Sequence, residues 1–295
     1  MAVIAGQEPS LREAKGWRRT KNRIATVLMV VAFVLVVIPL VFVLITVVAR
    51  GIKIISWTFL TSPIPPQVVP AGVGGIGPAI VGTFEIVGLA TVMAVPLGVL
   101  GAIYLNEYGG KGVLARLIGF MADVMTGVPS IVMGLFIFSI WVLHFQFSGF
   151  AGALALGCLM LPVVIRSTDE MLKLVPNPLR EGSYALGATK ARVTMTVVLP
   201  AAIGGIVSGA LLAIARAVGE TAPLLFTILT VTTVNLNPFS GPNTSLPSQI
   251  FANATSPYTG AQDRAWGTAL TLIVIAFALM IIARFITARF TRYTR

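Results

Sequence analysis

The sequence predicts an all-α integral membrane protein with six transmembrane helices. Of its 295 residues, 56% are hydrophobic and only 11% are charged, whereas soluble domains carry about 25% charged residues. The mean hydropathy is +0.93. The apolar residues also gather in runs that are long enough, as helices, to cross a hydrocarbon core about 30 Å thick. A water-soluble fold of this composition would expose large apolar patches, so the bilayer is the simpler environment.

The six spans define the predicted organisation of the chain. A basic segment, 1–23, precedes an uncharged run of 25 residues, 24–48, which is too long for a signal peptide and is expected to remain as the first span. A loop rich in proline and glycine, 49–73, follows outside the membrane. One transmembrane domain, 74–285, holds the other spans, and a tail, 286–295, ends the chain. The spans expected in this domain are 77–104, 117–143, 150–165, 201–230 and 266–285.

Lysine and arginine are distributed unequally between the connections of these spans. Seventeen of the 21 lie in the basic segment, in the second-to-third and fourth-to-fifth connections, and in the tail. The opposite side, including the long loop 231–265, holds only Arg50, Lys53 and Arg264. Positive residues favour the cytoplasmic side, so both termini are predicted to be cytoplasmic. This pattern accounts for the net charge of +11 without a nucleic-acid partner.

The sequence offers little material for metal or nucleotide chemistry. The single cysteine and single histidine, Cys158 and His144, exclude an internal disulfide and a cysteine-rich metal site. The phosphate-binding pattern G-x-x-x-x-G-K-[ST] does not occur. We therefore expect no catalytic residue, no metal and no cofactor bound by this chain, and no ATP hydrolysis by the chain alone.

Two opposite charges interrupt the fifth apolar run. Arg216 and Glu220 are four residues apart, so they share one face of a helix and can pair. An arginine at the bilayer centre costs at least about 2.5–3.5 kcal/mol, and such charges usually face a bundle interior or a wet cavity. Arginine stays protonated and offers a planar fork of donors to an oxyanion. We therefore place Arg216 in a substrate path with Glu220 as its orienting partner; a structural ion pair is the alternative.

The connection between the fourth and fifth spans contains a segment, 173–192, that predicts a short amphipathic helix. The helix is expected to start after Pro178 and to stop near Gly187, where glycine lets the backbone reverse. A short helix held between two spans can dock into a groove of a soluble partner. The alternative is an ordinary surface helix that keeps the two spans apart.

This segment resembles the EAA motif of the permeases of ABC importers. The residues that carry the resemblance at the family spacing are Glu181, Gly187, Val197, Leu199 and Pro200. The departure is that Gly182 and Ser183 stand where the motif has two alanines. The resemblance implies a coupling helix that engages a cytoplasmic ATPase through Glu181, Gly182, Ser183, Gly187 and Ala188. It also implies that ATP and Mg are bound by that partner ATPase.

The stretch AIARAVGETAPLL, which contains Arg216 and Glu220, is similar to the R-A-x-G-E-T-A-P segment of phosphate-specific ABC importer permeases. Four further stretches agree with this family: GGIGPAIVGT from Gly74, IYLNEYG from Ile103, DVMTGVPSIVMGLF from Asp123 and PVVIRSTDEMLKLVP from Pro162. The resemblance covers about 74–285 and implies a type-1 permease fold. The order of the motifs and the single amino-terminal span fit the A subunit of this family better than its paralogue, the C subunit.

The resemblance implies a multi-pass protein of the bacterial cytoplasmic membrane and a set of partners. These are a homologous permease (PstC), two copies of an ATPase subunit (PstB) and an external phosphate-binding protein (PstS). The transported substrate would be inorganic phosphate, driven by ATP hydrolysis on the ATPase.

The resemblance further implies that Arg216 lies in the anion path, with Arg166 as a second candidate. Arg166 can equally be a positive anchor at the cytoplasmic end of the fourth span, paired with Asp169 or Glu170. Glu85 and Asp123 also lie in or beside apolar runs and can be helix-interface or gating groups; we expect structural roles first, because a carboxylate that lines an anion path would repel the substrate.

Three alternatives remain for the function. A permease for another oxyanion, sulfate or molybdate, is the nearest, because such permeases also carry EAA segments. A self-sufficient secondary transporter or channel is disfavoured by the EAA resemblance. A membrane anchor without transport is disfavoured by the charged pair in the fifth span, whose cost an anchor need not bear.

Overall fold

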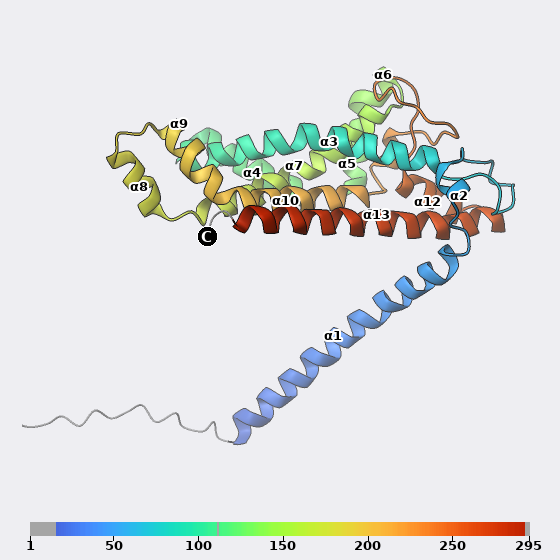
Figure 1. The fold of residues 1–295 in the computed structure, drawn as a ribbon, viewed down its shortest axis with the longest axis horizontal. Helices are drawn as coiled ribbons and strands as arrows, with labels where there is room; N and C mark the ends of the chain where they lie inside the picture. The colour runs from blue at the N-terminus through green and yellow to red at the C-terminus, as the bar shows by residue number, and fades with distance from the viewer. Residues whose placement is uncertain (1–15, 111, 293–295) are drawn as a thin grey trace, which may run out of the picture. The chain divides into compact units, whose positions relative to one another are not determined.

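The computed structural model describes residues 16–110 and 112–292. Three parts of the predicted cytoplasmic side therefore lie outside the described residues: 1–15 of the basic segment, Lys111, and 293–295 of the tail. All regular structure in the described part is helical, as the composition predicts (Figure 1). The chain divides into two compact units, Met1–Ala49 and Arg50–Arg295.

The first unit is dominated by α1 (Gly16–Gly51), which contains the predicted first span. The stretch Arg19–Gly51 has a mean hydropathy of 3.4 in its most apolar window, and none of that window is buried. Pro39 lies within the helix. A helix with apolar side chains exposed on all its faces is what a lipid-facing span requires.

The second unit is a bundle of helices built around α7. Its elements are α2 (Trp57–Thr61), α3 (Gly77–Ile103), η1 (Tyr104–Tyr108), α4 (Val113–Gly127), α5 (Ser130–Ile137), η2 (Phe138–Val142), α6 (Leu143–Phe145), α7 (Gly149–Lys173), α8 (Asn177–Ala185), α9 (Lys190–Val193), η3 (Thr194–Val198), α10 (Leu199–Val218), α11 (Leu224–Thr227), α12 (Leu246–Ala254) and α13 (Thr259–Arg292). The three η elements are π-helical turns. Together with α1, the described residues hold five helices long and apolar enough to cross a membrane, or six if a bent pair counts as one span.

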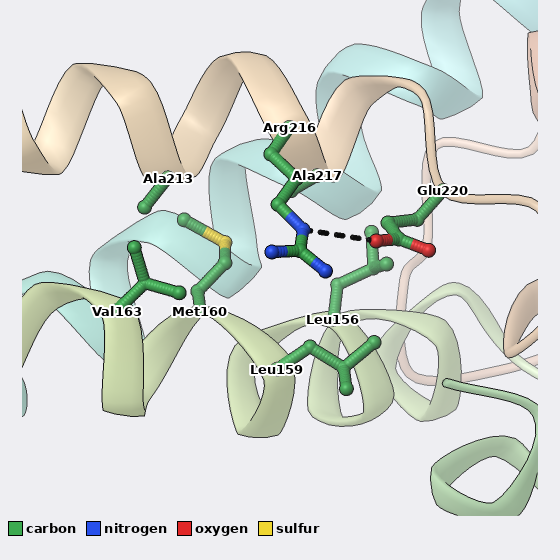
Figure 2. Close-up of a pocket in the computed structure, with 8 residues that line it drawn as sticks. All are labelled: Leu156, Leu159, Met160, Val163, Ala213, Arg216, Ala217 and Glu220. Carbon is green, nitrogen blue, oxygen red and sulfur yellow. Dashed lines mark hydrogen bonds and ion pairs between the residues drawn. The ribbon is translucent and has the colours of Figure 1, made fainter. Parts of the chain in front are cut away.

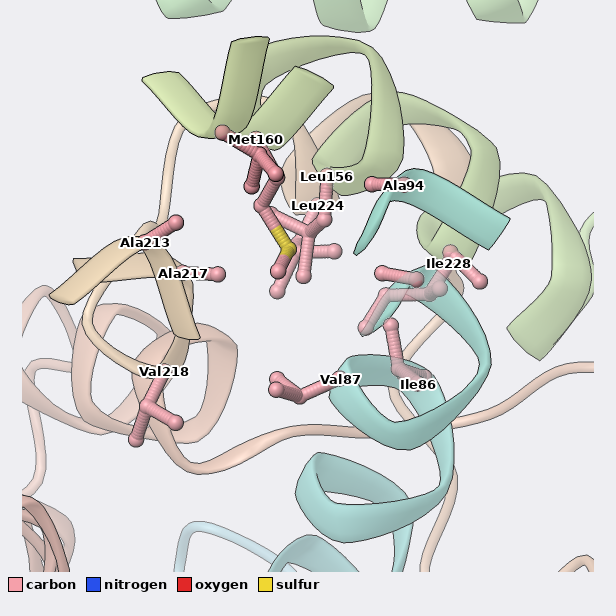
Figure 3. Packing of buried hydrophobic residues seen from close by; sticks show 13 residues of the cluster. Ile86, Val87, Ala94, Leu156, Met160, Ala213, Ala217, Val218, Leu224 and Ile228 are labelled. Carbon is pink, nitrogen blue, oxygen red and sulfur yellow. The ribbon is translucent and has the colours of Figure 1, made fainter. Parts of the chain in front are cut away.

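The main apolar core lies between α3, α7, α10 and α11. Ile86 of α3, Leu156 and Met160 of α7, Ala217 of α10 and Leu224 of α11 are all buried in it (Figure 3). Small residues allow the close approach, since a Cβ added to Gly98 of α3 would lie 2.7 Å from a methyl carbon of α7. The path of α7 through the bundle therefore fixes the positions of the helices around it.

The predicted third span, 117–143, is broken rather than continuous. The pair Val113–Gly127 and Ser130–Phe145 is bent by 108°. Val128 adopts an extended conformation before Pro129, with ψ at 125°. Proline disfavours the helical region for the residue before it and has no N–H to donate, so the helix must end there.

The predicted fifth span, 201–230, begins and ends later than the helical stretch in the structure. The helical stretch runs from Lys190 to Val218 and stops twelve residues before the predicted end. Between Gly219 and the predicted end at 230, the chain forms only the single turn α11, and Ile228 is extended. Pro223 interrupts the run and packs against α5, where a Cβ added to Gly134 would lie 2.7 Å from the Cα of Pro223.

The first predicted loop was expected to be a structured loop or a short helix, and only the structure of the second is not revealed by its composition. The loop 49–73 holds α2, and the loop 231–265 holds α12 and the beginning of α13. Arg264, expected in that loop, is instead buried on α13. Its guanidinium donates to four carbonyl oxygens of the 66–70 segment, at 2.6–3.2 Å.

Candidate substrate path and coupling segment

Arg216 and Glu220 meet at the end of α10, as their spacing predicts. The Nε of Arg216 donates to Oε1 of Glu220 at 3.3 Å (Figure 2). The helix is finishing here, because the Gly219 N–H bonds to the Arg216 carbonyl at 3.0 Å and the Glu220 N–H to the Ala217 carbonyl at 3.2 Å. These tighter bonds turn the chain and let the Glu220 side chain return toward the guanidinium.

The pair lines a shallow pocket whose other walls are apolar. Alongside the two charged residues, α7 contributes Leu156, Leu159, Met160 and Val163, and α10 contributes Ala213 and Ala217 (Figure 2). The residues from α7 belong to the middle of that helix. Arg216 is therefore in the last turn of α10 but level with the central part of a transmembrane helix.

The two side chains differ strongly in exposure. The Arg216 side chain is 70% exposed and the Glu220 side chain is 18% exposed. One face of the guanidinium is thus held by the carboxylate while the rest is open. A charge that faced lipid at this depth would be expensive, so this face of the chain must meet water or another protein. The arrangement can present an oriented cationic fork to an anion that enters from that side.

Arg166 lies on α7 but does not join the Arg216 pair. Its Nη2 atom donates to the carbonyl of Gly119 at 3.0 Å and pairs with Asp123, both on α4. The prediction that Arg166 pairs with Asp169 or Glu170 is wrong. Asp169 is buried and pairs with Lys173 one turn further along. The helix α4 packs against α7 on the side of Arg166, and this tertiary contact takes precedence over the local pairing.

The geometry gives Asp123 a structural partner, but it does not remove Arg166 from the path. Val163, which lines the pocket, is three residues before Arg166 and so lies on the same face of α7. The Arg166 side chain remains 34% exposed. Arg166 can therefore contribute positive potential near the pocket while it is held by Asp123.

The coupling segment forms a helix close to the predicted bounds. The helix α8 runs from Asn177 to Ala185, with Pro178 in its first turn, where proline is tolerated. Gly187 has a φ of +80°, which favours glycine, and its N–H closes the helix onto the Tyr184 carbonyl at 2.9 Å. The Ala188 N–H bonds to the Ser183 carbonyl at 3.2 Å.

The surface of α8 is open on almost every side. Its residues include none that is buried, and Glu181 and Gly182 are exposed, while the Ser183 hydroxyl donates to the Leu179 carbonyl. Leu186, directly after the helix, is 90% exposed. An exposed acidic residue beside exposed apolar ones is the surface expected of a helix that docks into a groove.

Sequence reasoning missed two polar contacts that join distant parts of the chain. Arg180, next to Glu181, forms a largely buried ion pair with Glu107 at 3.0 Å. Glu85 accepts a 2.9 Å hydrogen bond from Asn243, which agrees with the structural role expected for it. The signal for both was a carboxylate inside or beside an apolar run, but sequence separations of 73 and 158 residues hide the partners.

Within 16–110 and 112–292, no group of three or more histidine, cysteine, aspartate or glutamate side chains lies close enough to hold a metal ion.

The chain is similar to known transport proteins over most of its length. Residues 94–295 match the family of binding-protein-dependent transport system inner membrane components. The chain is 46% identical to "phosphate transport system permease protein PstA 1" of Mycobacterium tuberculosis (strain ATCC 25618 / H37Rv) over 94% of this chain and 91% of that protein. It is 42% identical to "phosphate transport system permease protein PstA" of Yersinia pestis, over 95% of this chain and 94% of that protein.

Solved structures share the fold at low sequence identity. A chain of a bacterial alginate ABC transporter superposes with a TM-score of 0.67 at 13% identity, covering 94% of this chain and 99% of its own length. A chain of the inward-facing MetNI methionine ABC transporter superposes with a TM-score of 0.57 at 18% identity, covering 73% of this chain and 94% of its own length. These similarities show the type-1 ABC importer permease fold.

Proposed function

The chain belongs to the family of binding-protein-dependent transport system inner membrane components, and from this premise we propose that it is the permease subunit that passes inorganic phosphate through the membrane in an ABC importer. The observation that carries the proposal is its similarity, over almost the full length of both chains, to permeases named for phosphate transport. The permease itself is not an enzyme, because ATP hydrolysis in such importers belongs to a separate subunit. ATP and Mg would be bound there.

Arg216 is proposed to meet the anion. Its guanidinium is oriented by Glu220 and otherwise open, so it can donate a fork of hydrogen bonds to phosphate oxygens without first breaking a buried contact. Arg166 would add positive potential along the same face of α7. Leu156, Leu159 and Val163, which line the pocket beside the pair, offer the anion no competing hydrogen-bond donor.

The open face at Arg216 supports a second permease as partner. Phosphate would cross between this chain and a homologous permease of the PstC type, which together alternate between outward and inward cavities. An external phosphate-binding protein of the PstS type would deliver the anion and supply most of the selectivity.

The ATPase is proposed to engage α8. Two copies of a PstB-type subunit would bind the two permeases, and Glu181, Gly182, Ser183, Gly187 and Ala188 would form the contact on this chain. The open surface of α8 supports this role. The excess of lysine and arginine on its side of the chain supports a cytoplasmic position for α8 and for both termini.

Uptake of labelled phosphate tests the proposal. Cells that lack this chain but keep the other subunits would be complemented with the intact chain, Arg216→Ala or Arg216→Lys, at matched membrane levels. The intact chain is expected to restore uptake that excess sulfate or molybdate does not block. Arg216→Ala should lower uptake about 10-fold or more, because a hydrogen bond to a charged group contributes about 1.5–3 kcal/mol.

Arg216→Lys, which keeps the charge and loses the planar fork, should fall between the two. Uptake of sulfate or molybdate in place of phosphate would keep the importer class and refute the substrate. Normal uptake by Arg216→Ala would remove Arg216 from the path.

A further inference from the structure

The π-helical turn η1, at the end of α3, contacts three different elements through three successive residues. Asn106 bonds to Asp169 of α7 at 3.4 Å, Glu107 pairs with Arg180 of α8, and the ring of Tyr108 lies under the ammonium of Lys190 at the start of α9, at 5.3 Å. These three elements follow one another in the chain and include the proposed coupling helix. One turn of α3 therefore touches the coupling helix and both of its flanks.

The pair of Glu107 and Arg180 is the most buried of these contacts. The two side chains are 5% and 14% exposed. The guanidinium also donates to the carbonyls of Leu172, at 2.8 Å, and Val175, so that it ties α8 to the end of α7 as well. These carbonyls belong to the last turn of α7 and its exit, and the Leu172 carbonyl also accepts the N–H of Val175 at 3.3 Å.

Arg180 anchors α8, which makes few other packing contacts with the rest of the bundle. No residue of α8 is buried, and the elements that pack most against it are the short α9 and η3. The position of α8 relative to α3 and α7 therefore depends strongly on this one side chain. A buried ion pair contributes little net stability compared with apolar residues of similar volume, so the pair is better explained by the position that it fixes.

The geometry of η1 allows its side chains to contact several elements at once. Successive residues point about 100° apart in an α-helix and less in the wider π turn, so three of them span about half of the circumference. The N–H of Gly109 bonds to the carbonyl of Tyr104 at 2.6 Å, which gives the wider five-residue turn. Single π turns of this kind are frequent at functional sites, because they shift the facing of side chains without ending the helix.

We propose that η1 is the junction through which displacement of α8 is passed to α3 and α7, with Glu107 and Arg180 as its positioning residues. The inference rests on the proposed function, in which an ATPase moves α8. The core beneath the junction joins the same elements, since Ala102, Leu172 and Val193 pack together in one buried cluster. A shift of α8 would therefore reach α7, which walls the substrate path, and α3, which packs against α7.

The test is the number of phosphate ions moved per ATP hydrolysed by the complete importer in proteoliposomes. The informative variant is the double change Glu107→Gln/Arg180→Gln, because a single change would leave one buried charge without its partner and disturb folding. The double variant should still copurify with the ATPase subunit, because neither side chain is on the exposed surface of α8. Its ratio of phosphate to ATP should fall about 5-fold or more, the range of a typical coupling between two sites.

Arg116→Gln is the matched control, because Arg116 is an exposed arginine of α4 whose side chain makes none of the contacts described above. Its ratio should equal that of the wild type. An unchanged ratio in the double variant, with the wild type transporting phosphate, would refute the junction alone. A wild-type complex that hydrolyses ATP and moves no phosphate would instead refute the proposed function.

Tyr108→Leu extends the test if the double variant does not accumulate. Tyr108 is 47% exposed and its contact with Lys190 lies at the surface, so its removal leaves no buried charge. A lowered ratio with normal ATPase copurification supports the junction. A normal ratio in Tyr108→Leu, or parallel losses of transport and hydrolysis, contradicts it.

Discussion

At the residue scale, the arginines of this chain behave according to what surrounds them. Arg216 keeps one carboxylate partner and an open face, whereas Arg264 is fully enclosed and has carbonyl oxygens as its partners. Composition does not distinguish the environments of these two arginines, and Arg264 was expected in the loop 231–265. The open arginine is available to the ligand of the proposed function, whereas the enclosed one holds the 66–70 segment in place.

Arg264→Met is expected to destabilise the protein. The change removes the guanidinium donors from the carbonyls of Val69, Pro70, Pro66 and Gln67, of which those of Pro66 and Pro70 keep a backbone N–H. Each hydrogen bond to a charged group contributes about 1.5–3 kcal/mol. Thermal unfolding of the purified complex should therefore begin at a lower temperature than in the wild type. Arg116→Met, at an exposed position, should have little effect, and equal melting of both variants would show that the Arg264 contacts are not stabilising.

The candidate site was only partly accessible to sequence reasoning. The spacing of Arg216 and Glu220 was enough to predict their pairing, because four residues correspond to about one helical turn. The partner of Arg166 was missed because Asp123 comes from another helix, and local spacing carries no information on such contacts. Glu107 and Arg180 were missed for the same reason.

At the element scale, hydropathy located the spans but not their breaks. A run such as 117–143 stays apolar across Pro129, although the backbone bends there by 108°. The end of α10 was missed because residues 219–230 remain apolar while they pack as irregular chain against α5 and α7. The short helix α8 was found because proline and glycine mark its ends directly.

Close packing at Gly82 provides an element-scale prediction. A Cβ at this position of α3 would overlap the Thr244 carbonyl oxygen and the side chain of Asn243. Gly82→Ala should therefore push the 243–245 segment away from α3 and lower stability by about 1–3 kcal/mol, as overpacking does elsewhere.

Gly88→Ala on the same helix is the matched control, because a Cβ there meets no atom within 4 Å. The two variants would be compared by thermal unfolding of the purified complex in detergent. Gly88→Ala is expected to be neutral or slightly stabilising, since alanine favours helix. A Gly82→Ala protein as stable as Gly88→Ala would mean that the contact at Thr244 is loose.

At the scale of the whole molecule, the chain exposes charged and apolar surfaces that neither lipid nor water alone can cover favourably. Lipid suits the apolar sides of its spans, but it does not suit Arg216, and water alone does not account for the open apolar residues at α8. A permease that is one part of an assembly explains both surfaces, because a second permease and an ATPase would cover them.

The proposed orientation is testable because Cys158 is the only cysteine in the chain. On a Cys158→Ser background, Ala185→Cys places a thiol on α8 and Ser240→Cys places one in the 231–245 loop; both positions are exposed. A membrane-impermeant maleimide added to intact spheroplasts should label Ser240→Cys, and Ala185→Cys only after permeabilisation. The reverse pattern would put α8 outside and end its coupling role.

The most direct measurement of the central claim is transport by purified components. The chain would be reconstituted into proteoliposomes with its second permease and ATPase, and supplied with the phosphate-binding protein and labelled phosphate. The account predicts accumulation that requires ATP, persists in excess sulfate, and falls about 10-fold or more with Arg216→Ala. Phosphate movement that is independent of ATP, or ATP-driven accumulation of sulfate in its place, would contradict it.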